Sequence, residues 1–225
     1  VGLFLPLRGR WTGPSGPGRR GSVSPAGPVA LGTGDREQPL ETQYPYATPV
    51  LNRFYVYMDD VTSTDAKNLD DDTGEFENFT SNTACGGSLV IPGSGKSGWF
   101  MNLNQYGRGE QTVSGAVIVG GLVAFSTNRP VPRTANACAP LGEARGYWVN
   151  LFNASGAIGS VDIACGGDRS GTFAGGGLPP TPVVADVQVD GRVETVVLGA
   201  ANKKGGAPVH QGHRIMRLVI LGHIG

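Results

Sequence analysis

Short runs of large apolar residues, separated by glycine, asparagine and proline, make up the middle of this 225-residue chain. The runs are rich in β-branched and aromatic residues, and they lack the spacing of apolar positions that an amphipathic helix would show. Residues 52–59, NRFYVYMD, alternate large apolar side chains and give the clearest strand pattern. The other predicted strands cover residues 28–34, 99–103, 116–119, 122–127 and 147–152.

Glycine-containing turns join several of these runs, and glycine supplies the positive φ angles that tight hairpins need. Residues 113–127 and 180–200 share one pattern, in which a small or proline residue precedes two apolar runs joined by such a turn. Strands and hairpins at this spacing are typical of β-propeller blades, which take about 40–45 residues each. We therefore predict an all-β, antiparallel fold of partial, propeller-like blades with long loops. About three blades fit, whereas closed propellers have at least about four, so we expect a partner or further chain to complete the ring.

Composition divides the chain into three parts. Residues 1–27 are rich in glycine, proline, arginine and serine and predict an irregular lead-in. Residues 28–200 form the predicted propeller-like domain, and the acidic, periodicity-free stretch 59–82 is predicted to be a long surface loop inserted in it. Residues 201–225 are predicted to be a tail or a closing strand.

The charge of the chain narrows the classes of function. Lysine plus arginine and aspartate plus glutamate number 18 each, and charged residues make up only 16% of the chain. With so few and such balanced charges, we do not expect the chain to bind nucleic acid or an anionic membrane through electrostatic attraction. No apolar run approaches the ~18 residues needed to span a bilayer. The chain opens on Val1, and we expect it to be a processed or excised piece of something longer.

Three cysteines, Cys85, Cys138 and Cys165, are spaced too widely for a CxxC metal site. They are either three buried thiols or, in an exported protein, one disulfide and one remaining thiol. Cys138 and Cys165 are the preferred pair, because both flank the same predicted hairpin.

One segment has a partial calcium-binding pattern. Asn68, Asp70 and Asp72 alternate as at the start of an EF-hand loop, and calcium takes about 6–8 oxygen ligands. However, Gly74 comes one residue late, and Phe79 stands where the bidentate glutamate would be. A solvated acidic loop is therefore the favoured interpretation, and a calcium site is the alternative.

Two further motifs invite a chemical interpretation. GSGKSG at 93–98 lacks the first glycine of a phosphate-binding P-loop and precedes a predicted strand instead of a helix, which indicates a hairpin loop. His210, His213 and His223 all lie in the last sixteen residues, where a zinc site would lack a third ligand nearby. We interpret them as surface residues.

No pattern of residues predicts catalysis, and we expect a protein that is not an enzyme. Asp35, Arg36 and Glu37 could surround a cation, but such a cluster more often ties a loop to a strand end through salt bridges. Aromatic residues in polar or turn-like contexts could form a contact surface or pack over loop ends. They are Trp11, Tyr44, Tyr46 and Tyr106.

Several blocks of sequence carry a resemblance to a known family. They are GTGDREQPL, NRFYVYMDD, GWFMNL, GEQTVSGAVIVGGLVAFSTNRPVPRTANAC and GYWVNLFNASG. Their order and spacing resemble the C-terminal β-propeller of the PilC/PilY family, whose members are type IV pilus tip-associated adhesins. The pattern of that family is G-x-G-x-R-E, N-R-F-Y, G-W-x-x-x-L, G-E and F-x-T-x-x-P, followed by a cysteine. The resemblance covers about residues 28–200.

The resemblance implies a secreted, cell-surface protein of the pilus (fimbrium) tip that acts in pilus biogenesis, retraction control and cell adhesion. Its implied partners are minor pilins and a host or abiotic surface, and the rest of a larger parent chain is implied as well. Family members often carry a calcium loop of alternating aspartates, so calcium is the one cofactor to consider. Two alternatives stay open: a quinoprotein-type β-propeller enzyme, whose blades share the strand-turn rhythm of residues 147–156, and a secreted structural β-domain unrelated to pili.

Overall fold

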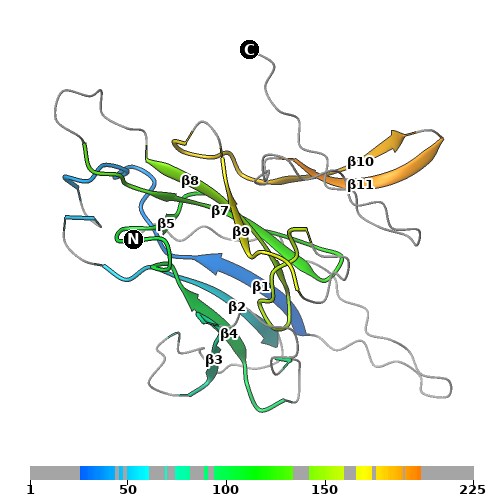
Figure 1. The fold of residues 1–225 in the computed structure, drawn as a ribbon. Helices are drawn as coiled ribbons and strands as arrows, with labels where there is room; N and C mark the ends of the chain where they lie inside the picture. The colour runs from blue at the N-terminus through cyan, green and yellow to red at the C-terminus, as the bar shows by residue number, and fades with distance from the viewer. Residues whose placement is uncertain are drawn as a thin grey trace.

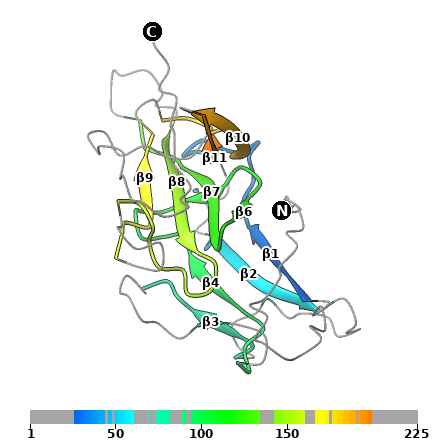
Figure 2. The same cartoon turned by 90° about the vertical axis from the view of Figure 1, so that its right-hand side faces the viewer.

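The chain is all-β throughout the part that the structure, a computed structural model, describes. That part comprises residues 26–43, 46–47, 50–60, 69, 74–81, 89–90, 94–133, 142–159, 166–173, 176–189 and 191–198. Its strands form three sheets (Figures 1 and 2), and none of the described residues is helical. The predicted fold class is thus confirmed as all-β, while the described strands close into neither a barrel nor a propeller.

The first sheet has four strands in the order β1-β2-β4-β3. Strand β2 (Arg53–Asp60) lies between β1 (Ala26–Gly32) and β4 (Gly98–Asn102) and is antiparallel to both. Strand β3 (Phe76–Asn78) pairs with β4 in parallel. The prediction of an uninterrupted loop over 59–82 is corrected here, because Phe76 is buried and anchors a short strand within that acidic segment.

The second sheet has five strands, all paired antiparallel. Its main path runs β5 (Gln111–Thr112), β7 (Leu122–Arg129), β8 (Glu143–Asn150) and β9 (Ser170–Thr172). Strand β6 (Val117–Val119) pairs with β7 through a two-residue turn at Gly120 and Gly121, whose φ angles are 56° and 79°. Positive φ at both turn residues is what a tight hairpin needs, so the hairpin predicted within 113–127 is confirmed.

The main core lies between the first and second sheets. The ring of Phe54 on β2 stacks on Phe125 of β7 with a centroid distance of 3.5 Å, and Phe125 stacks on Tyr147 of β8 at 4.6 Å. Trp99 of β4 is fully buried, and its indole Nε1 donates a hydrogen bond of 2.7 Å to the carbonyl oxygen of Leu151. These contacts join the two sheets across their facing surfaces.

Strand β2 is buried on both faces. Phe54 and Val56 point into the main core, whereas Tyr55 belongs to a second buried cluster on the opposite face. There the rings of Tyr55 and Phe76 meet edge to face, at a centroid distance of 6.0 Å and an angle of 81°. This double burial explains why consecutive positions of β2 are large and apolar, as in a strand covered on both sides.

The third sheet is the hairpin of β10 (Val183–Val189) and β11 (Arg192–Leu198), drawn in orange in Figure 1. The predicted second copy of the hairpin pattern is therefore confirmed as a hairpin. One position of β11, Val197, is buried against Leu122 and Trp148 of the second sheet. Val183 and Val193, by contrast, are 56% and 73% exposed.

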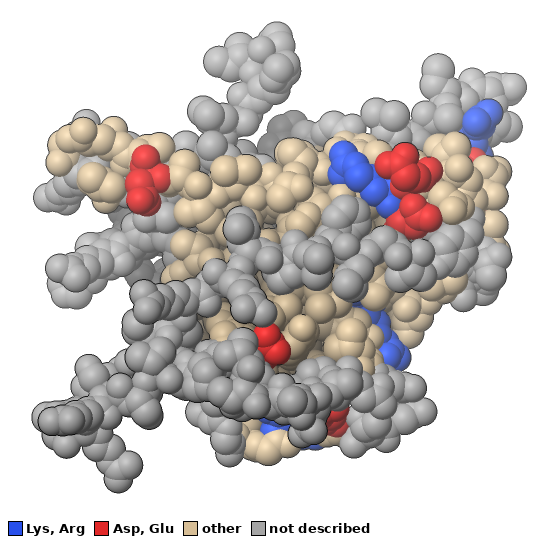
Figure 3. All heavy atoms as spheres, turned by 180° about the vertical axis from the view of Figure 1, so that it is seen from behind, with Lys and Arg blue, Asp and Glu red and all other residues tan. Residues whose placement is uncertain are grey.

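The surface carries charges of both signs. Figure 3 shows the acidic and basic side chains of the described residues in small, separate groups on the face seen from behind. This distribution agrees with the equal totals of 18 acidic and 18 basic residues in the sequence. Within the described residues, the structure offers no helix of the length and apolar character needed to cross a membrane.

Candidate functional site

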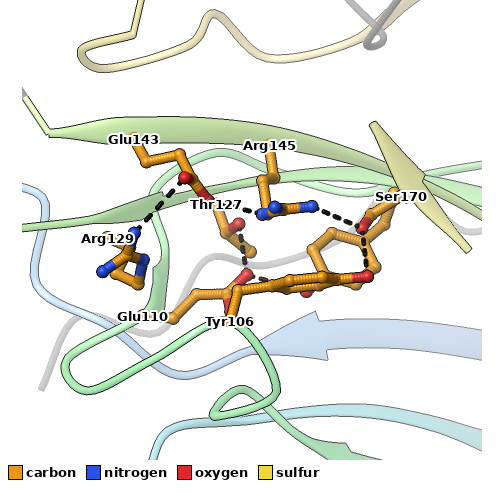
Figure 4. A network of polar contacts seen from close by, with 8 residues as sticks. Tyr106, Glu110, Thr127, Arg129, Glu143, Arg145 and Ser170 are labelled. Atoms are coloured by element: carbon orange, nitrogen blue, oxygen red, sulfur yellow. Dashed lines mark hydrogen bonds and ion pairs between the residues drawn. The ribbon is translucent and has the colours of Figure 1, made fainter. Parts of the chain in front are cut away.

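A buried carboxyl group makes polar contacts with two strands of the second sheet. Glu110, just before β5, is fully buried. Its Oε1 accepts a hydrogen bond from Thr127 Oγ1 (Figure 4) and another from the Tyr147 hydroxyl, each 2.7 Å long. Its Oε2 is buried as well and finds no hydrogen-bond donor among the described residues. Two donors therefore bind one oxygen, and the other oxygen lies in the core with no donor from the part of the chain that the structure describes.

Burial changes the ionisation of this group. Removal from water raises the pKa of Glu110 above its ordinary 4.5, although the hydrogen bonds from Tyr147 and Thr127 oppose that change. The pKa of Tyr147 is raised well above 10.0, first by its own burial and then by the neighbouring Glu110 carboxylate. Desolvation disfavours the charged form of both acids, so the core favours the neutral carboxyl and keeps the phenol protonated.

The register of β7 against β8 brings these side chains together. Phe125 is paired with Tyr147, Thr127 with Arg145, and Arg129 with Glu143. Because side chains alternate along a strand, every second residue of both strands lies on one face of the sheet. A single face thus carries the aromatic stack, then the hydroxyl of Thr127, and then a pair of opposite charges nearer the surface.

An outer layer of polar contacts covers the buried carboxyl (Figure 4). Arg145 donates through Nε to Glu143 Oε1 at 2.6 Å, and Arg129 Nη2 lies 3.3 Å from Glu143 Oε2. Arg145 Nη1 also donates to Ser170 Oγ at 3.2 Å, and its guanidinium carbon lies 3.3 Å from the centre of the Tyr106 ring. Partial burial raises the pKa of Glu143, but the hydrogen bond and charge of Arg145, together with the charge of Arg129, hold it below 4.5.

A second buried charge lies beside this layer. Arg169, just before β9, is only 6% exposed, and its Nη1 donates to the carbonyl oxygen of Thr80 at 3.0 Å. Its Nε and Nη2 are buried and find no hydrogen-bond acceptor among the described residues. Burial lowers the pKa of this guanidinium below its ordinary value. A pocket of about 230 Å³ adjoins it, lined by Gln105, Tyr106, Gly167, Asp168, Arg169 and Ser170.

The two buried charges suit different tasks. Glu110 does not line the pocket, and its two donors come from β7 and β8. Its role is therefore to fix the segment before β5 against these two strands. Arg169 lines the pocket, and a guanidinium only donates hydrogen bonds, so this side chain suits an acceptor group better than it suits proton transfer.

The DRE cluster proves to be part of the framework of the fold. Arg36 Nη1 donates to the carbonyl oxygens of Val113 at 2.7 Å and Pro179 at 3.3 Å. The carboxylate of Asp35 accepts hydrogen bonds from the backbone N–H of Glu37 and from the side-chain amide of Gln38. The cluster ties a loop to the end of a strand, as predicted, but through hydrogen bonds instead of salt bridges.

Other predicted residues have ordinary structural roles. Lys96, in the 93–98 motif, donates to the carbonyl oxygen of Gly74 at 2.8 Å and precedes β4, as the prediction of a loop requires. The loop is not a hairpin, because β4 runs parallel to the preceding strand β3. Of the predicted aromatic residues, Tyr46 lies under Arg108 at 5.1 Å, and Tyr106 belongs to the outer polar layer.

The remaining predicted sites lie outside the described residues. This holds for the calcium candidates Asn68, Asp70 and Asp72 and for the proposed disulfide partners Cys138 and Cys165. It also holds for Cys85, the three histidines, Trp11 and Tyr44, and for the segments 1–25 and 199–225. Within the described residues, no group of three or more histidine, cysteine, aspartate or glutamate side chains is placed to hold a metal ion.

Sequence reasoning missed both buried charges. Glu110 stands in the GEQT block, where its neighbours are typical of a charged turn residue before a strand. Arg169 stands in GGDRSG, whose glycines and polar residues predict an exposed loop. Nothing local separates either residue from a surface charge, since their burial comes from strands far away in the sequence.

Comparison with known proteins adds a distant likeness at the level of the fold. No protein-family model matches the sequence, and no curated protein matches it. Among solved structures, the C-terminal domain of PilY1 from Pseudomonas aeruginosa is similar, with a TM-score of 0.49 and 14% sequence identity, over 80% of this chain. The match covers 41% of the length of that structure. At these values the likeness is a weak one at the level of the fold and carries no conclusion about function.

Proposed function

We propose that this chain is a non-catalytic binding domain of a cell-surface protein that acts at the tip, or in the biogenesis, of type IV pili. The proposal starts from the sequence blocks that resemble the PilC/PilY family. It is supported by where those blocks lie in the fold. In this proposal the sheets serve as a rigid scaffold, and the loops and outer side chains contact the partners.

The observation that carries the proposal is that the blocks meet in one buried junction. Asn52, from the NRFY block, accepts a hydrogen bond from Thr33 at 3.0 Å and donates to the carbonyl oxygen of Glu110 at 3.1 Å. The side chain of Gln111 accepts from the backbone N–H of Asp35 at 2.7 Å. Blocks far apart in the sequence thus contact one another in three dimensions, which supports the proposal.

The glycines of the first block fit the same junction. A Cβ atom at Gly32 would overlap the Thr112 side chain, and one at Gly34 would overlap the Thr112 carbonyl oxygen. Glycine is therefore required for the end of β1 to approach β5 closely. Together with the hydrogen bond from Arg36 to Val113, this gives each fixed position of the G-x-G-x-R part of the pattern a physical purpose.

We also propose that the chain shares the other features implied by the family resemblance. They are localisation at the cell surface, propeller-like completion of the sheets by the parent chain or a partner, and binding of minor pilins and of a host or abiotic surface. A calcium ion bound by the segment of Asn68, Asp70 and Asp72 belongs here as well.

The test is genetic and biochemical. Deleting the gene for the full-length parent should abolish piliation and twitching, and the purified parent should capture recombinant minor pilins. Within the DRE cluster, Arg36→Ala should fail to complement the deletion because it removes the bonds to Val113 and Pro179, whereas the exposed neighbour Glu37→Ala should complement it. Normal piliation and twitching in the deletion strain would overturn the pilus role. Turnover of an alcohol or sugar substrate on addition of a quinone and calcium would overturn the non-enzymatic role.

A further inference from the structure

The Arg169 guanidinium uses one of its three nitrogens in a hydrogen bond to the described residues. Its Nη1 donates to Thr80, whereas Nε and Nη2 are buried without an acceptor among the described residues. Leaving a buried charged donor without a partner is more costly than leaving a neutral one, because the charged group loses more hydration. A side chain that is only 6% exposed and still keeps two free donors therefore calls for an explanation.

The two unused donors form a geometric pair. Nε–H and the nearer Nη2–H point in parallel from the same side of the planar guanidinium, which is the edge that binds a carboxylate through two hydrogen bonds. The used donor, Nη1, is on the other side of the group. The free edge thus has the spacing of two oxygens of one carboxylate.

The adjoining pocket can supply room and further contacts. Its volume of about 230 Å³ is lined by Tyr106, Ser170 and Gln105 in addition to Arg169 and its neighbours. The exposed Gln105 amide donates to the same Thr80 carbonyl oxygen that Arg169 uses, so its side chain lies beside the guanidinium. Exposed side chains change rotamer in picoseconds to nanoseconds, so the Gln105 amide can leave Thr80 and donate to a bound ligand without repacking of the core.

We propose that Arg169 anchors a carboxylate-binding site, with Tyr106, Ser170 and Gln105 around the bound group. Asp168 also lines the pocket, and its negative charge disfavours dianions such as phosphate and sulfate relative to a single carboxylate. The carboxylate can come from a free organic acid or from an acidic side chain of a partner protein. This inference does not depend on the pilus role proposed above.

The experiment is an NMR titration of the full 225-residue chain with matched probes. Acetate, lactate and N-acetyl-glutamate amide should shift the backbone amides of Gly167, Arg169 and Ser170, with dissociation constants on the order of millimolar. N-acetyl-glutamine amide, the neutral isostere, should shift none of them. Stronger binding of blocked glutamate than of lactate would identify a partner's acidic side chain as the source, and the reverse order would identify a free acid.

Variants locate the site. Arg169→Lys keeps the charge but loses the paired donors and should weaken binding at least tenfold, as should Arg169→Gln. Arg133→Gln removes an exposed arginine that does not line the pocket and should leave binding unchanged. The proposal is overturned if the wild-type chain responds equally to the glutamate and glutamine probes, if it binds phosphate more tightly than acetate, or if folded Arg169→Gln binds as the wild type does. The wild-type titration tests the proposal even if a variant does not fold.

Discussion

Replacing Tyr147 with phenylalanine removes one hydroxyl from the buried network and leaves the aromatic stack in place. The phenol donates to Glu110 Oε1 at 2.7 Å, and the ring lies 4.6 Å from Phe125 at an angle of 7°, so the stack does not depend on the hydroxyl. A hydrogen bond to a charged group contributes about 1.5–3 kcal/mol to stability, and a neutral one about 0.5–1.5 kcal/mol. We expect Tyr147→Phe to cost about 2–3 kcal/mol where Glu110 is ionised and about 1 kcal/mol where it is neutral.

The pH dependence follows from the raised pKa of Glu110. The folded state holds this proton more tightly than the unfolded state, so the contribution of Glu110 to stability is fully present below its ordinary 4.5 and is lost as the pH rises through the raised pKa. The Tyr147 hydrogen bond lowers that pKa, and its removal raises it further. The cost of the substitution must therefore grow as the pH rises above 4.5.

Urea unfolding, followed by the fluorescence of the buried Trp99 and Trp148, measures this cost at about pH 4, below the ordinary pKa of 4.5, and at a series of higher pH values. A loss of about 2 kcal/mol corresponds to a fall in Tm of about 4–8 °C for a chain of this size. Tyr106→Phe is the control; its ring is 37% exposed, and its loss should stay within about 0.5 kcal/mol. In a Glu110→Gln background the cost of Tyr147→Phe should no longer depend on pH. A cost that stays equal over the whole pH series in the wild-type background would refute the raised pKa of Glu110.

Three further predictions, two of them with a matched control substitution, test other parts of the structure. Gly34→Ala should lower the free energy of unfolding by more than about 3 kcal/mol, because its Cβ meets the backbone of β5. In Gly115→Ala the nearest neighbour of the new Cβ is a methyl group at 3.5 Å, and the loss should stay under about 1 kcal/mol. Chemical denaturation measures both losses. Arg169→Met should raise the free energy of unfolding by about 1–3 kcal/mol, since it removes unpaired buried donors, and a large loss of Tm would argue against that account. On the third sheet, Val197→Ala should cost about 2 kcal/mol and Val193→Ser less than about 0.5 kcal/mol, and equal Tm values would show that this hairpin does not pack as described.

The strands that could be predicted from the sequence were those with a distinct local pattern of apolar residues or turn glycines. The alternation in residues 52–59 and the paired glycines at 120–121 led to β2 and to the β6–β7 hairpin with only small shifts at their ends. Strand β3 was not predictable, because it has three residues and pairs in parallel with a strand that begins at Gly98. The pairing of β3 with β4, which are far apart in the sequence, depends on the burial of Phe76 against β2. Such pairing leaves no periodic pattern in the local sequence.

The candidate site was less accessible to sequence reasoning than the fold. Glu110 and Arg169 differ from surface charges only in what surrounds them, and those surroundings come from β7, β8 and the turn that contains Thr80. Charge, spacing and motif carry no information about such burial. The glycines of the first sequence block, in contrast, signal a close backbone approach by their type alone, and the structure assigns that approach to Thr112.

The stack of Phe54, Phe125 and Tyr147 has a consequence for how this chain acquires its structure. Its members lie far apart in the sequence, so neither sheet can cover its apolar face before the other has been synthesised and collapsed onto it. Topologies dominated by such distant pairings fold in milliseconds to seconds, far more slowly than helical bundles. A truncated version for expression must therefore keep β1 through β9 together, since a cut between β4 and β5 would leave two aggregation-prone halves.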